Sequence, residues 1–88
     1  LDPSEAQFRA IFMSLSAKMK LACSGEVIDY LIEKHYKGAN RGLRFCHPRD
    51  LLRQIANFCS FHETRGEVTR ENVDAAVRNY FAAIAVAQ

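Results

Sequence analysis

Apolar residues recur every three or four positions in four separate stretches of this 88-residue chain. This spacing places them on one face of an α-helix, and no stretch shows the regular alternation of a paired strand. We therefore expect an all-α fold, a single domain over residues 1–88 that forms a small four-helix bundle. Two very short extended pieces, at 43–45 and 67–69, are the strand-like segments that the pattern predicts.

Local capping signals set the expected ends of these helices. The helices are predicted from Ser4 to about Lys20 or Leu21, from Gly25 or Glu26 to about residue 37, from Pro48 to 63–65, and from the Thr69 cap to the C-terminal end. The apolar stripes of the four helices predict the core. Its main members are expected to be Phe8, Phe12, Leu31, Leu51, Leu52, Ile55, Phe58, Val73, Val77 and Phe81.

Composition excludes several classes of protein. No apolar run approaches the roughly 20 residues that cross a bilayer, so no membrane association is expected. The formal net charge of +2 indicates no particular partner. Three cysteines cannot all pair within the chain, which suggests reduced thiols in a cytoplasmic protein, two of them in the core. Because the chain starts at Leu1 without a signal-peptide pattern, we expect it to be a piece of a longer protein.

The strongest candidate for a binding site is Pro48-Arg49 at the start of the third helix. An arginine in the first turn opposes the helix dipole, and such a broken local rule is often functional. A guanidinium beside a helix N-terminus suits an anion, above all a phosphate. The other interpretation is a surface ion pair of Arg49 with Asp50, Glu26 or Glu67.

Cysteine and histidine residues offer two further kinds of chemistry. Cys46-His47 and Cys59 with His62 contain metal-binding side chains, but only one pair has ligand spacing and it lies on an apolar stripe. Core packing is therefore the better interpretation, and no metal is expected. A Cys46–His47 nucleophile is also disfavoured, because adjacency in sequence does not create the required pairing in space.

The segment from Lys37 to Arg49 also contains Arg41 and Arg44, and no acid interrupts these four cations. Such a loop could contact phosphates of nucleic acid. A helix-turn-helix is excluded, since its turn has about three or four residues. A helical binding module that docks a protein or nucleic acid through this loop remains an alternative function.

Taken together, these features resemble the C-terminal lid subdomain of AAA+ ATPases. The similarity covers Pro3 to about Ile84. Its most specific part is Cys46-His47-Pro48-Arg49-Asp50-Leu51-Leu52, which resembles the sensor-2 segment of that family. The run from Gly66 to Val73 looks like the short extended approach and capped last helix of such lids.

The resemblance implies a function for the domain. It would close over ATP held by a preceding α/β subdomain of the same chain, and Arg49 would reach the γ-phosphate. ATP and Mg²⁺ would be cofactors of the parent protein, a ring-forming homo-oligomer. The parent would be the ATPase, whereas this domain alone would not be catalytic. No role is assigned to Arg41 or Arg44.

Overall fold

A computed structural model describes residues 2–87 of the chain. Within that range the elements are α1 (Glu5–Lys18), α2 (Gly25–Tyr30), η1 (Leu31–Lys37), α3 (His47–Phe61) and α4 (Arg70–Ala87). η1 is a π-helix that continues α2 without a break, so the two form one helical rod. The expected all-α class with four helical rods is therefore confirmed for these residues.

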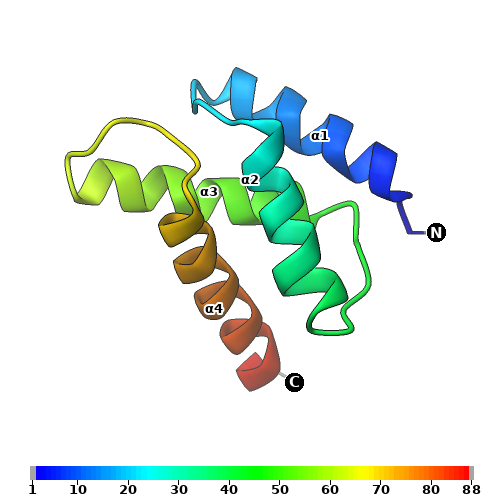
Figure 1. The fold of residues 1–88 in the computed structure, drawn as a ribbon. Coiled ribbons are helices and arrows are strands. Elements are labelled where there is room, and N and C mark those ends of the chain that lie inside the picture. Colours follow the sequence, from blue (N-terminus) through cyan, green and yellow to red (C-terminus); the bar gives the residue numbers. More distant parts are fainter. Residues whose placement is uncertain (1, 88) are drawn as a thin grey trace.

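The central helix is α3, which packs against both α1 and α4. Figure 1 shows α3 running across the molecule, with α1 above it and α4 descending from the loop that follows it. η1 packs beside α4. No helix in residues 2–87 is long and apolar enough to span a membrane.

The hydrophobic core lies between these helices and contains most of the predicted residues. Phe8 and Leu52 are fully shielded from solvent. The prediction was wrong for Phe58 and Phe81, which are only partly buried, although Phe81 packs against the core. Their places are taken by side chains of the second rod and of the loops: Leu21, Val27, Ile28, Ile32, Tyr36 and Val68 are buried.

Three helical segments end in Schellman turns whose left-handed residue is not glycine. Lys20, Asn40 and Glu63 have φ angles of 59°, 52° and 54°. At Lys20, for example, the next backbone N–H donates to the Ser16 carbonyl at 2.9 Å. With these turns, α1 ends at Lys18 and α3 ends at Phe61, earlier than predicted. The sequence did not reveal the turns, because no glycine marks either end.

Only one of the two predicted extended segments takes part in a bridge. Glu67 forms an isolated parallel bridge with Ala22, and the Val68 N–H donates to the Ala22 carbonyl at 2.8 Å. This bridge joins the α1–α2 loop to the α3–α4 loop. Residues 43–45 form no bridge. Instead, the carbonyl of Arg44 accepts the first N–H of α3, from His47.

Candidate functional site

Arg49 lies in the first turn of α3 and its side chain is 55% exposed. Its Nε donates to Oδ1 of Asp50 at 3.1 Å. The two terminal amino groups of the guanidinium make no hydrogen bond to another side chain of residues 2–87. Arg49 therefore forms an ion pair with Asp50, one of the three partners in the alternative interpretation, and still presents two donor groups to solvent.

The turn that carries Arg49 is anchored by the two residues before it. Pro48 is fully buried at the start of α3, where it gives up no helical hydrogen bond, and it supports the turn. His47 is also buried, and its Nδ1 lies 2.8 Å from the Tyr36 hydroxyl. Burial, with help from the nearby charges of Arg44 and Arg41, lowers the pKa of His47. The imidazole is therefore neutral near pH 7.

Asp50 connects this turn to α4. Its Oδ2 accepts a 2.6 Å hydrogen bond from the Tyr80 hydroxyl, while Oδ1 accepts from Arg49. The hydrogen bond from Tyr80 is the largest influence on the pKa of Asp50 and lowers it, although partial burial opposes the effect. Burial and the same hydrogen bond raise the pKa of Tyr80. At neutral pH the pair is therefore a phenol that donates to a carboxylate.

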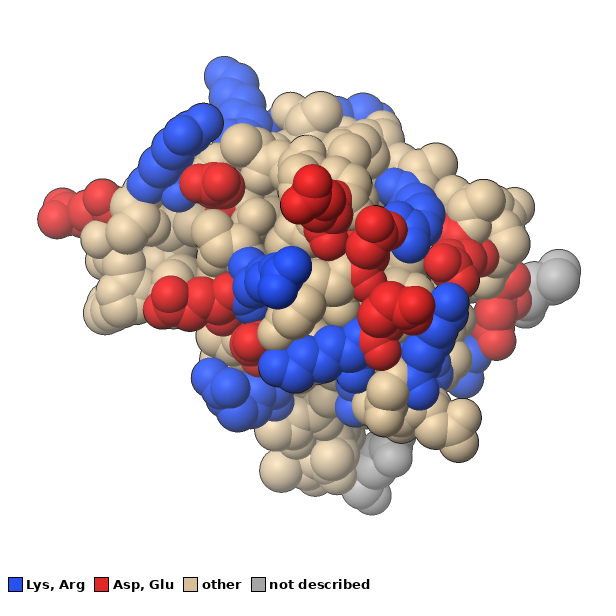
Figure 2. Space-filling model, viewed as in Figure 1, with Lys and Arg blue, Asp and Glu red and all other residues tan. Residues whose placement is uncertain are grey.

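Most cations of the basic loop already contact groups of the chain itself. Lys37 pairs with Glu5 and Glu33, and Arg44 pairs with Asp2 at 2.6 Å. The Arg41 guanidinium lies 3.6 Å from the ring centre of Phe81, and it also donates to the carbonyl of His35 at 3.0 Å. Figure 2 shows basic and acidic side chains intermingled on the viewed face, rather than a continuous basic surface.

The cysteines and histidines do not assemble into a reactive or metal-binding group. All three cysteines are free, and only Cys59 is buried, so the prediction of two core thiols was wrong. Cys46 is exposed, whereas the imidazole of its neighbour His47 packs among aromatic rings in the interior. His62 lies against Phe58 on the surface, with 4.4 Å between ring centres. Residues 2–87 contain no cluster of three potential metal ligands.

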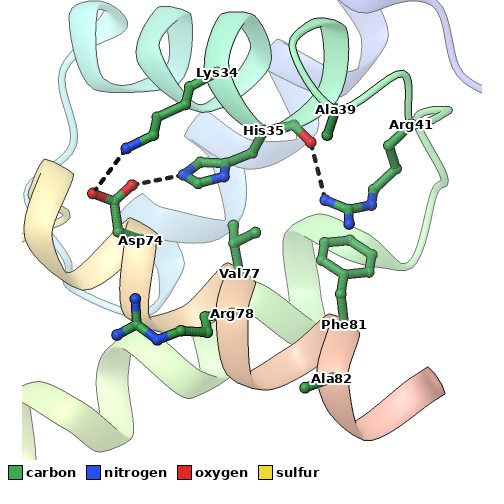
Figure 3. Close-up of a pocket in the computed structure, with 9 residues that line it drawn as sticks. All are labelled: Lys34, His35, Ala39, Arg41, Asp74, Val77, Arg78, Phe81 and Ala82. Atoms are coloured by element: carbon green, nitrogen blue, oxygen red, sulfur yellow. Dashed lines mark hydrogen bonds and ion pairs between the residues drawn. The ribbon is translucent and has the colours of Figure 1, made fainter. Parts of the chain in front are cut away.

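A groove of about 510 Å³ between η1 and α4 was not predicted from the sequence (Figure 3). At one end of the groove His35 and Asp74 are joined by a 2.6 Å contact, and the Tyr30 hydroxyl donates to the same carboxylate at 2.8 Å. Partial burial disfavours the charged carboxylate, but the hydrogen bonds from His35 and Tyr30 lower the pKa of Asp74. The other end holds Arg41 over Phe81.

No local signal could have revealed this groove. Lys34 and His35 lie in the last turn of η1. Their partner, Asp74, is about forty positions away in sequence. Only the packing of η1 on α4 brings these side chains together.

Comparison with known proteins identifies one matching family. A family model described as a domain of unknown function, DUF8689, matches residues 4–79. No curated protein and no solved structure shows a significant match to the chain.

Proposed function

The chain belongs to the DUF8689 family, and we propose that its domain is the C-terminal lid of an AAA+ ATPase. In this proposal Arg49 is the sensor-2 arginine that contacts the γ-phosphate of ATP. The observation that carries the proposal is the exposed guanidinium of Arg49 on a turn that His47 and Pro48 hold in the core. The proposal places the domain in a cytoplasmic, ring-forming homo-oligomer.

The arrangement of the helices supports this assignment. The order of two helical rods, an irregular loop and a helix that opens with an arginine fits the resemblance found in the sequence. The short extended approach to α4 also fits, since Glu67 bridges to Ala22 and Thr69 caps the helix. The Thr69 N–H and the Asn72 side chain complete this cap reciprocally at 2.8 Å.

The chemistry of Arg49 suits a phosphate. A guanidinium presents a planar fork of donors that can bind two phosphate oxygens at once. The dipole at the start of α3 also favours negative charge at the same place. Asp50 occupies only Nε, so the fork formed by the two terminal amino groups stays available. In phosphoryl transfer such a fork stabilises charge that builds up on the phosphate oxygens.

The remaining parts of the ATP site would come from elsewhere in the polypeptide. Residues 2–87 lack a cluster of carboxylates or other ligands suited to Mg²⁺. The proposal therefore assigns the phosphate-gripping loop, the magnesium ligand and the catalytic acid to the preceding α/β subdomain. Within this domain, Arg49 is the residue that would contact ATP directly.

The experiment is steady-state ATP turnover by the full-length protein that contains this domain. Arg49→Ala is expected to lower kcat by about 100-fold, since one preorganised donor to the transition state is lost. Arg49→Lys keeps the charge but not the fork, so a large part of the loss should persist. The matched control is Arg53→Ala, one helical turn further along α3 and also exposed. Circular dichroism checks that each variant remains folded.

Unchanged turnover in Arg49→Ala would refute the assignment, as would an equal loss in Arg53→Ala. Salt-sensitive binding of DNA or RNA that disappears in Arg41 and Arg44 variants would instead favour a binding module. That outcome is less expected, because Arg44 is already paired with Asp2.

A further inference from the structure

The groove between η1 and α4 is a second surface, separate from the turn that carries Arg49. Its volume of about 510 Å³ lies within the usual range of ligand-binding clefts, and it is open to solvent. One wall is the π-helix η1, a rare geometry that recurs at functional sites. Figure 3 shows its floor, where Val77 and Phe81 of α4 lie between the flanking polar groups.

The charge of the groove is unbalanced. Three cations line it, Lys34, Arg41 and Arg78, against a single carboxylate, Asp74. That carboxylate already accepts hydrogen bonds from within the domain. Arg78 is exposed and makes no ion pair with any of residues 2–87. The lining therefore has an excess of positive charge that no group of the described chain neutralises.

Arg41 is also fixed in place before any partner arrives. Its guanidinium is stacked on Phe81 at 3.6 Å and tied to the His35 carbonyl at 3.0 Å. A cation held in this way loses little side-chain entropy when it binds an anion. Beside it, Ala82 and Val77 offer a small apolar surface. Fixed positive charge next to an apolar floor is complementary to carboxylates that flank an apolar side chain.

We propose that this groove docks a short acidic segment of a partner protein, with one apolar side chain on the floor and carboxylates at Arg41 and Arg78. Nucleic acid fits less well, because single strands need open aromatic faces on which bases stack. Arg41 covers Phe81, and Arg70 lies over Tyr30 with 4.9 Å to the ring centre. The proposal does not depend on the role of Arg49 in nucleotide sensing.

The test is an NMR titration of the ¹⁵N-labelled chain with a blocked peptide of the sequence Asp-Glu-Glu-Leu-Glu-Glu-Asp. Amide shifts should concentrate around the groove and weaken with added salt. The Leu→Ala version of the peptide should bind less tightly, and a version with Lys at every acidic position should not bind. Oligothymidine and ATP are titrated separately to test the other anions.

Arg78→Glu should weaken peptide binding by about fivefold or more, since an attractive charge becomes a repulsive one. Arg65→Glu is the matched control, with the same change in net charge on an exposed loop outside the groove, and it should change binding less than twofold. Ala82→Glu, at another exposed position of α4, places a negative charge at the groove and should also weaken binding.

The proposal is overturned if about 1 mM peptide causes no shift at the groove, or if the two arginine variants weaken binding equally. Preferential binding of oligothymidine or ATP in the groove would likewise overturn it. Amide shifts that ATP or oligothymidine causes only at the start of α3 would concern the role of Arg49. They would not affect the conclusion drawn from the peptide titration.

Discussion

The hydroxyl of Tyr80 donates a 2.6 Å hydrogen bond to Asp50, which joins the middle of α4 to the first turn of α3. The same carboxylate accepts from Arg49 with its other oxygen. A side chain thirty positions away in sequence thus fixes the residue that contacts the candidate phosphate-binding arginine.

Removal of this hydrogen bond should destabilise the domain. Tyr80→Phe is expected to lower the free energy of unfolding by about 1–2 kcal/mol, because the acceptor is charged but partly exposed. Urea denaturation measures the change. A double-mutant cycle with Asp50→Ala isolates the interaction and should give a coupling of at least about 0.5 kcal/mol. Additive effects of the two substitutions would show that the contact contributes nothing to stability.

The buried imidazole of His47 should make stability depend on pH. Its pKa is lower in the folded state than its ordinary value of about 6.5, so the unfolded chain binds the extra proton more readily. This contribution is fully present above pH 6.5 and is lost as the pH falls from there through the lower folded pKa. Urea denaturation of the wild-type chain between pH 7.5 and 5 should therefore show a decreasing free energy of unfolding.

The control for this effect replaces both partners of the buried contact. Tyr36→Phe with His47→Phe keeps the aromatic packing and leaves neither polar group unsatisfied. As the pH falls, the free energy of unfolding should decrease more for the wild type than for this variant. A difference that stays constant from pH 7.5 to 5 would contradict the assignment.

Leu52 tests the core. It is fully buried, and Leu52→Ala should cost about 2–5 kcal/mol, depending on how far the cavity collapses. The comparison is Phe61→Ala at the end of the same helix, where the side chain is 82% exposed and the expected cost is below about 0.5 kcal/mol. Thermal or urea unfolding of the two variants suffices. Similar costs at the two positions would contradict the burial described for α3.

The end of the π-helix is sensitive to a single methyl group. A Cβ at Gly38 would lie 2.6 Å from the backbone oxygen of Lys34, so Gly38→Ala must displace part of η1. We expect a loss of about 1–3 kcal/mol in unfolding free energy. Gly25→Ala is the matched control, since no atom lies within 4 Å of its Cβ, and it should be neutral or slightly stabilising. Equal stability of both variants would mean that η1 relaxes freely.

The candidate site was predictable in part. The position of Arg49 in the first turn of α3 followed from Pro48, whose preference for that turn is local. Asp50 was one of three acidic residues expected as possible partners of Arg49, and it is the one that forms the ion pair in the structure. The contribution of Tyr80 could not be predicted, because no local pattern links residues on different helices. For the same reason, the groove lined by His35 and Asp74 was missed.

The sequence by itself determined the number of helical rods, because apolar spacing and capping residues act within about four positions along the chain. It also determined most of the core, including Phe8 and Leu52. Tertiary structure decided what depends on contacts between distant segments. The Schellman turns at Lys20 and Glu63 end helices without glycine, and Glu67 forms a bridge with Ala22 of the α1–α2 loop. These features depend on how the helices and loops pack against one another, and tertiary packing overrides the conformational preferences of individual residues.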